Sequence, residues 1–211
     1  MKTIAITLVT LFLSLTSSFG QTSKDSLLVF IGEKIEVKYI PQKSSSDTTI
    51  LGKDTVITVG LKLDNRYRAK YKILQVINGS FRQDTITFTA YDHYGEPAFS
   101  KFKTVLLFVT PQKGELYHEK YQYFDLYLTA DNKWASPYSR RYTNDYYKDK
   151  ITIRPEKILF KEEVSSPISH LSEDQRKTMF PKPYFDIKNG NAIAIYGNYV
   201  DDLIKLQKQT N

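Results

Sequence analysis

The clearest alternation of apolar and polar positions lies in residues 66–73. Its apolar positions are Tyr67, Ala69, Tyr71 and Ile73, and the intervening positions are the cations Arg66, Arg68, Lys70 and Lys72. Because side chains alternate between the two faces of a strand, this period of two predicts a strand with one face toward a core and one toward water.

A second strand is predicted directly after the first. Asn78-Gly79 is a strong short-range hairpin signal, and residues 85–91 alternate between threonines and apolar side chains. A two-residue turn pairs Tyr71 with Ile86, Lys70 with Thr87 and Ala69 with Phe88. Both apolar rows then share one face, whereas an odd loop length would reverse one of them; other even lengths satisfy the same parity.

Three more strands are predicted by apolar and β-branched runs. They cover residues 27–40, with Gly32 at a bulge or bend, residues 105–109 and residues 122–128. The run 105–109 is continuously apolar, which is typical of a strand covered on both faces. Weaker signals predict strands within 56–63, 151–153, 158–164 and 192–196, and residues 41–50 have the composition of an exposed loop.

Two helices are predicted near the C-terminus. Ser172 and Gln175 have the spacing of a capping box. Asn198 is the predicted cap of a last helix. The apolar stripe of that helix consists of Val200, Leu203 and Ile204.

The first residues have the pattern of a secretory signal peptide. Lys2 supplies the positive start, Ile4 to Leu15 the apolar segment, and Ser18 to Gly20 the small residues before the cleavage site. The apolar run has about a dozen residues, fewer than the ~20 of a membrane-spanning helix. We expect cleavage between Gly20 and Gln21, release into the periplasm or the medium, and no transmembrane segment in the mature chain. A buried N-terminal helix or an uncleaved anchor is the alternative.

The composition of the chain excludes some kinds of site and favours some kinds of partner. The chain has no cysteine, which excludes disulfides, thiolate nucleophiles and cysteine-containing zinc sites. Its formal net charge of +7 becomes 29 − 23 = +6 when Lys2 leaves with the signal peptide. A basic surface favours anionic partners such as acidic glycans, lipid headgroups or acidic proteins.

The order of signals in residues 28–109 resembles the netrin-like and metalloproteinase-inhibitor-like domains. The resemblance rests on a first strand at Val29 to Ile35, a strand ending at Tyr71 to Gly79, a strand at Thr85 to Ala90 and an apolar strand at Val105 to Val109. These families have an OB-type barrel. The resemblance therefore implies a mainly β fold, with an OB-like antiparallel barrel domain in residues 21–130. An extension over 131–211 would add short strands and a C-terminal helix packed on the barrel.

One departure from this pattern and a second resemblance bear on function. Metalloproteinase inhibitors reach their target zinc with an N-terminal cysteine, and the predicted mature terminus is Gln21 instead. The whole chain, and Tyr91 to Gly95 in particular, also resembles uncharacterised exported proteins of Bacteroidota-type bacteria. That second resemblance implies a compartment rather than an activity.

Two surface features are candidate binding sites. The first is the cationic row of residues 66–72, whose side chains repeat every ~6.7 Å and form a stripe roughly 20 Å long. The second combines flat rings and cations, a composition typical of recognition surfaces. Its residues are Tyr123, Tyr127, Tyr138, Arg140, Arg141 and Tyr142. The alternatives are a solvated strand face for the first and ordinary packing for the second.

The histidines carry no recognisable catalytic or metal-binding motif. His93, His118 and His170 lack a second ligand at metal-binding spacing, and no nucleophile motif accompanies Asp92-His93. We expect no catalytic residue, metal or cofactor. The sequence predicts an exported, non-catalytic envelope protein that binds an anionic glycan or an acidic protein. Because the protein is expected to be exported, we do not expect it to bind nucleic acid. The alternatives are a secreted hydrolase with a loop-built site near His93 and a proteinase-inhibitor-like module.

Overall fold

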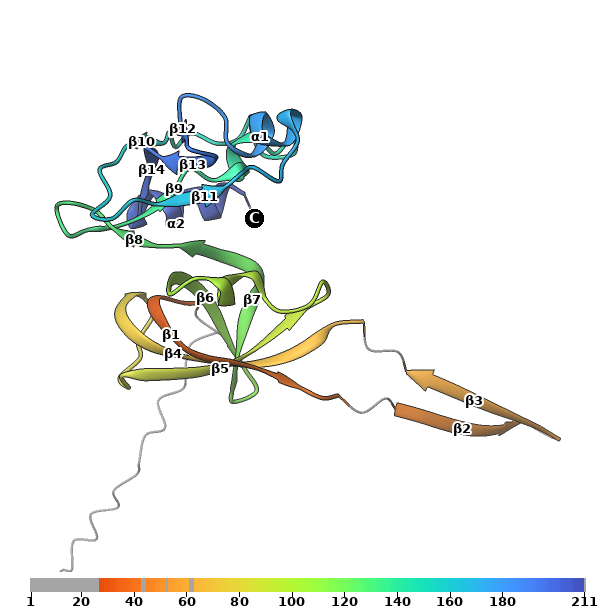
Figure 1. Ribbon diagram of the computed structural model, residues 1–211. Coiled ribbons are helices and arrows are strands. Elements are labelled where there is room, and N and C mark those ends of the chain that lie inside the picture. Colours follow the sequence, from red (N-terminus) through yellow and green to blue (C-terminus); the bar gives the residue numbers. More distant parts are fainter. Residues whose placement is uncertain (1–26, 43–44, 52, 61–62, 211) are drawn as a thin grey trace, which may run out of the picture.

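The computed structural model describes residues 27–42, 45–51, 53–60 and 63–210 (Figure 1). The predicted signal peptide and its cleavage site lie outside these residues. The described chain is mainly β, as the alternating patterns predict. Its helices α1 (Glu173–Met179) and α2 (Val200–Gln209) both lie near the C-terminus. Within the described ranges, no helix is long and apolar enough to cross a membrane.

Five strands close into a ring. Around the ring the order is β1 (Leu28–Ile40), β4 (Asn65–Asn78), β5 (Thr85–Asp92), β7 (Glu115–Asp125) and β6 (Thr104–Gln112), and β6 pairs with β1 again. Neighbours are antiparallel except β5 and β7, which meet in parallel through the pair of Thr89 with Tyr117. The strands predicted over 27–40, 66–77, 85–90 and 105–109 are all present, and most of the strand predicted over 122–128 lies in β7 and β8 (Tyr127–Leu128).

The pairing of β4 with β5 has the predicted register. Ala69 lies opposite Phe88, Lys70 opposite Thr87 and Tyr71 opposite Ile86. The predicted two-residue turn at Asn78-Gly79 is wrong, because the pairing ends at Lys72 and Thr85. Beyond that point β4 continues along β1, and the Asn78 side chain donates a hydrogen bond to the Leu27 carbonyl at 2.6 Å. Parity therefore fixes which faces meet but not where the two strands part.

Aromatic side chains fill the inside of the ring. Phe88 stacks on Tyr71 with ring centroids 5.8 Å apart and contacts Phe30 edge-on at 6.3 Å. The predicted irregularity at Gly32 is present as a register shift between β1 and β4. A Cβ at Gly32 would lie 2.8 Å from the Phe30 ring and 3.1 Å from the Tyr71 ring. Glycine at this position therefore lets the aromatic core close.

Strand β6 is covered on both faces, as its continuous apolar run predicts. Its inward side chains are Val105, Leu107 and Val109, and its outward side chains are Leu106 and Phe108. Leu203 and Leu206 of α2 belong to the outer cluster. The C-terminal helix therefore packs on the outside of the ring (Figure 1).

The predicted cap of α2 is wrong. Tyr199 is the N-cap residue and makes no side-chain cap bond. Asn198 lies in β14 (Tyr196–Tyr199), where its side chain accepts a hydrogen bond from the Tyr142 hydroxyl at 2.8 Å and donates one to the Arg154 carbonyl at 3.0 Å. A buried amide must satisfy both its donor and its acceptor, and Asn198 does so by joining separate segments.

The remaining C-terminal strands are short and form two small sheets. One has the order β10 (Glu156–Lys157), β14, β9 (Trp134–Pro137) and β8, and the other has the order β11 (Ser165–Pro167), β13 (Asn191–Ala194) and β12 (Phe185–Lys188). The strand predicted over 192–196 falls in β13 and β14. Residues 151–153 form no strand, and 158–164 contribute an isolated bridge at Phe160. The capping box of Ser172 and Gln175 at α1 is confirmed.

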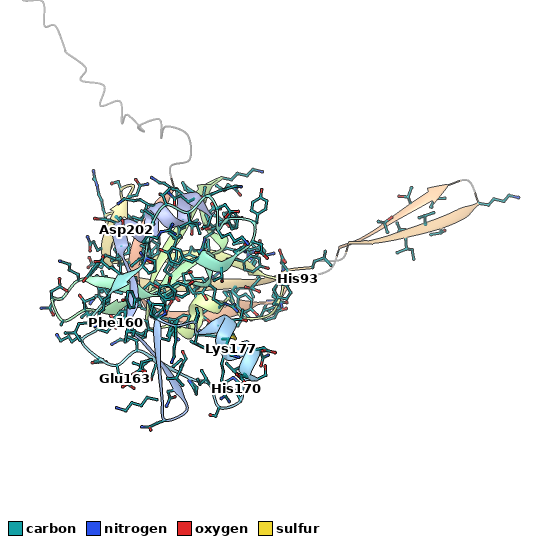
Figure 2. All side chains as sticks on the ribbon, turned by 90° about the horizontal axis from the view of Figure 1, so that it is seen from above. His93, Phe160, Glu163, His170, Lys177 and Asp202 are labelled. Atoms are coloured by element: carbon teal, nitrogen blue, oxygen red, sulfur yellow. The ribbon has the colours of Figure 1, made fainter. Side chains whose placement is uncertain are left out.

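A two-stranded arm projects away from the ring (Figures 1 and 2). It consists of β2 (Ser45–Leu51) and β3 (Asp54–Gly60), which pair with each other between β1 and β4 in the chain. The prediction of a loop over 41–50 is therefore wrong for residues 45–50. The strand predicted within 56–63 is present as β3 over residues 56–60, and residues 61–62 lie outside the described residues. β2 faces no core, so its sequence lacks the apolar alternation that marks a half-buried strand.

Candidate binding surfaces

The outer face of β4 carries the predicted cations. Tyr67, Ala69 and Tyr71 belong to the core inside the ring, so the residues between them point outward. We call Arg66, Arg68, Lys70 and Lys72 the β4 cation row. All four are accessible, and Arg66 is the most covered of them.

Most of the charge of the β4 cation row is unpaired. Arg66 lies 3.8 Å from Glu115. The nearby acids of β1, Glu33 and Glu36, form ion pairs with lysines outside the row. Arg68, Lys70 and Lys72 form no ion pair or side-chain hydrogen bond with the described residues.

The outer face of β5 places hydroxyls and an aromatic pair beside this row. Thr85 and Thr87 are exposed and lie opposite two of the lysines. Tyr91 lies opposite Arg66 and stacks on Tyr117 of β7, with ring centroids 6.4 Å apart and planes 8° apart. The face therefore combines cations, hydroxyls that donate or accept hydrogen bonds, and aromatic surface.

The structure brings most of the second predicted surface together in one cleft of about 300 Å³. The cleft lies between β7 and residues 136–141, and we call it the Asp125 cleft. Its predicted residues are Tyr123, Tyr138, Arg140 and Arg141, and Tyr121 and Asp125 line it too. Tyr127 lines an adjoining cavity of about 290 Å³ that shares Asp125, Tyr138 and Arg140. Tyr142 lies behind the cleft, against Tyr138.

The faces of Tyr138 are taken up by the fold. Its ring lies between those of Tyr184 and Tyr142, with centroids 3.9 and 5.3 Å away. Tyr123 packs against Phe99 and Phe102 with centroids 6.4 and 6.0 Å away. A ligand in the cleft therefore meets edges and hydroxyls of these tyrosines rather than an open stacking face.

The two arginines of the cleft differ in their surroundings. Arg141 donates a hydrogen bond to the Thr210 hydroxyl at 2.7 Å, and its guanidinium lies 4.9 Å from the Phe124 ring centroid. Arg140 is exposed, and its side chain forms no hydrogen bond or ion pair with the part of the chain that the structure describes. Arg140 is therefore the cation that the cleft presents to a ligand.

Asp125 is the acid of the cleft. Its carboxylate accepts hydrogen bonds from the Tyr127 hydroxyl and, at 3.5 Å, from Ser136 Oγ. Burial raises the pKa of Asp125, because desolvation disfavours the charged form, while the hydrogen bonds act in the opposite direction. Asp125 forms no ion pair with a described residue, so Arg140 and Asp125 line the same cleft without neutralising each other.

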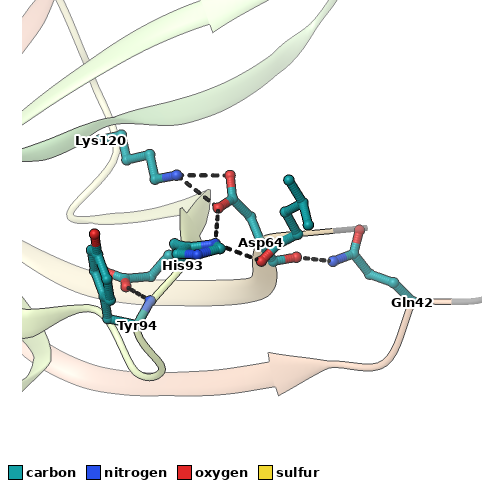
Figure 3. A network of polar contacts seen from close by, with 7 residues as sticks. Gln42, Asp64, His93, Tyr94 and Lys120 are labelled. Atoms are coloured by element: carbon teal, nitrogen blue, oxygen red, sulfur yellow. Dashed lines mark hydrogen bonds and ion pairs between the residues drawn. The ribbon is translucent and has the colours of Figure 1, made fainter. Parts of the chain in front are cut away.

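A polar network joins the base of the arm to the ring (Figure 3). Lys120 of β7 donates to both carboxylate oxygens of Asp64, at 2.7 and 2.8 Å. His93 Nδ1 donates to the Leu63 carbonyl at 2.9 Å and lies 3.6 Å from the Asp64 carboxylate. Gln42 donates from its side chain to the Asp64 carbonyl at 2.6 Å. The network anchors both ends of the arm beside β7.

The surroundings of His93 meet only part of the requirement for a hydrolase. A carboxylate is near, but Lys120 binds it, and Nδ1 donates its hydrogen bond to the Leu63 carbonyl rather than to the carboxylate. Within the described ranges, no hydroxyl is bonded to His93 and no group of three or more acidic or histidine side chains could hold a metal ion. The cluster is arranged as an anchor of the arm.

His118 belongs to the core rather than to a surface. Its ring lies 4.5 Å from Phe99, and Nε2 donates to the Gln122 carbonyl at 2.9 Å. Burial lowers the pKa of His118 to about 4, so the ring is neutral at physiological pH. His170 is exposed.

Three residues of these surfaces, Asp125, Tyr94 and Tyr121, are not predicted from the sequence as binding residues. The alternation in 122–128 places Asp125 on one face with Tyr123 and Tyr127, a signal that fits its position in the cleft. Tyr94 and Tyr121 stand exposed at the base of the arm. No local pattern marks them, because their exposure depends on tertiary packing.

Comparisons with protein-family models, with curated proteins and with solved structures found no match for this chain.

Proposed function

We propose that this is an exported, non-catalytic binding protein whose β4 cation row holds an anionic glycan. The observation that carries the proposal is the set of unpaired cations on the outer face of β4, Arg68, Lys70 and Lys72. Their alternate positions place charges every ~6.7 Å along an extended surface. A linear polymer with repeated negative charges matches such a row better than a small compact anion does.

The strand order supports an OB-like barrel, which we include in the proposal. In chain order β1, β4, β5, β6 and β7 are the first to fifth ring strands, and the fifth lies between the third and the fourth. OB-type barrels bind oligosaccharides and oligonucleotides on the face of their second and third strands, flanked by the loops between strands one and two and between strands four and five. The β4 cation row lies on the second strand, and the arm is inserted in the first of those loops.

A glycan is favoured over an acidic protein by the neighbours of the row. Exposed threonine hydroxyls and the Tyr91–Tyr117 pair suit a hydroxylated polymer. Among the described residues of β1 and β4, the exposed large apolar side chains are Ile35, Tyr39 and Leu74, fewer than the core of a protein interface needs. The hydrolase alternative would need a nucleophile near His93, and the inhibitor alternative rests on family resemblance alone.

The test replaces Arg68, Lys70 and Lys72 with Gln and measures binding of polygalacturonate by residues 21–211 at low salt. Each exposed charge contact contributes up to about 1 kcal/mol, so we expect a loss of about 10- to 100-fold in affinity. The matched control removes the exposed lysines Lys157, Lys177 and Lys188, which lie far from β4 in the chain, and should change binding little. Equal losses of affinity in both variants would mean that binding depends on net charge alone, and would contradict a specific site on β4.

A further inference from the structure

Two exposed tyrosines stand together at the end of the ring where the arm begins. Tyr94 is 87% exposed and Tyr121 is 48% exposed. Their ring centroids are 6.3 Å apart and their planes are tilted by 35°. In contrast to Tyr138, whose faces are covered, these rings offer aromatic surface to solvent.

The backbone holds both rings in place. The Asp92 carboxylate accepts a hydrogen bond from the Tyr94 backbone N–H at 2.8 Å, which fixes the turn that carries Tyr94. Tyr121 has a φ of 65°, a left-handed conformation that bulky L residues rarely adopt. Such strained residues concentrate at functional sites, and here the strain presents the ring at the surface of β7.

Tyr121 also forms part of the wall of the Asp125 cleft. The same cleft contains the unpaired guanidinium of Arg140 and the carboxyl group of Asp125. A ligand in the cleft that also contacts the tyrosine pair would therefore have an aromatic surface, a cation and a partly buried hydrogen-bonding acid within reach.

Tyr121, in the wall of the cleft, lies near the start of β4, where the β4 cation row ends at Arg66. Lys120, whose ammonium group is 5.2 Å from the Tyr121 ring centroid, binds Asp64. Asp64 directly precedes β4, whose second residue is Arg66. A polymer lying along the row from Lys72 to Arg66 is thus directed toward the tyrosine pair.

We propose that Tyr94, Tyr121, Arg140 and Asp125 form a subsite for one uronic acid residue, a sugar ring that bears a carboxylate. The sugar ring packs on the tyrosine pair, its carboxylate pairs with Arg140, and its hydroxyls bond to Asp125. A cavity of about 300 Å³ accommodates one pyranose. This inference rests on the proposed function, because it assigns the sugar chemistry of the same anionic glycan.

The experiment measures binding of digalacturonate, of the neutral disaccharide cellobiose and of polygalacturonate by calorimetry. Tyr121→Gly is the central variant, because glycine adopts a positive φ without strain. We expect an unchanged or higher Tm together with a loss of digalacturonate affinity of at least ~10-fold, the equivalent of about 1.4 kcal/mol. Arg140→Gln should remove the preference for digalacturonate over cellobiose. Tyr146→Ala, at a tyrosine 72% exposed elsewhere, is the matched control and should bind as the parent does.

The outcomes separate the two proposals. If polygalacturonate binds through the β4 cation row but Tyr121→Gly and Arg140→Gln bind digalacturonate as the parent does, the subsite is wrong and the proposed function stands. If neither ligand binds the parent protein, both are overturned. Loss of digalacturonate binding in Tyr121→Gly with an unchanged Tm supports the subsite, since the substitution relieves backbone strain and does not disturb the fold.

Discussion

At the scale of single residues, local alternation predicts well which face of a strand a side chain takes. It predicts less well what surrounds that side chain. The period of two in 66–73 places Tyr71 inside the ring and Lys70 outside, because strand geometry alone decides which face a side chain takes. It does not reveal that Tyr138 is enclosed by Tyr184 and Tyr142 or that Tyr121 is exposed. Those environments arise from segments far apart in the chain.

His118 should make stability depend on pH. Its pKa is about 4 in the folded protein and about 6.5 when unfolded, so the unfolded chain binds the extra proton between these values. The contribution of His118 is therefore fully present above pH 6.5 and is lost as the pH falls toward 4. At about 1.4 kcal/mol per pH unit the full loss is about 3 kcal/mol.

Urea unfolding at pH 7 and pH 4.5 checks this expectation. His118→Gln keeps a donor for the Gln122 carbonyl but does not titrate, so its stability should fall less between the two pH values. His170→Gln, at an exposed histidine, should follow the parent protein. Parallel pH profiles for the parent and His118→Gln would show that the core histidine is not the cause.

At the scale of elements, a buried apolar face and a local capping signal are the patterns that predict strands and helices. The continuous run 105–109 correctly predicts a strand covered on both sides, and the capping box at Ser172 correctly starts α1. The weaker signal within 56–63 correctly predicts β3, but β2 is missed because the arm packs on no described core. The cap of α2 is missed because Asn198 serves a tertiary network.

Leu206 tests whether α2 is an integral part of the folded ring. Its side chain is fully buried in the outer cluster with Leu106 and Phe108. Leu206→Ala should lower the free energy of unfolding by about 2–5 kcal/mol, because it removes apolar contacts and leaves a cavity. Lys208→Ala, at an exposed position of the same helix, should change it by less than about 0.5 kcal/mol. If Leu206→Ala changes the free energy of unfolding only slightly in a cooperative transition, α2 does not contribute to the stability of the ring.

At the scale of the whole molecule, sequence patterns predict the class of the fold but not the closure of the ring. The alternations show which strands have a core face, and the hairpin parity fixes one register. Closure depends on the pairing of β1 with β6 and on the contact of β5 with β7, which no local pattern contains. The same closure places β4, which carries the β4 cation row, and β7, which lines the Asp125 cleft, in one ring.

The salt dependence of polygalacturonate binding tests the central claim most directly. If Arg68, Lys70 and Lys72 contact the polymer, the plot of log affinity against log salt concentration is steep for the parent protein. It should be markedly flatter for the variant with Gln at these positions, while the variant at Lys157, Lys177 and Lys188 should keep the parent slope. Identical slopes for all three proteins would contradict the β4 cation row as the site that binds an anionic glycan.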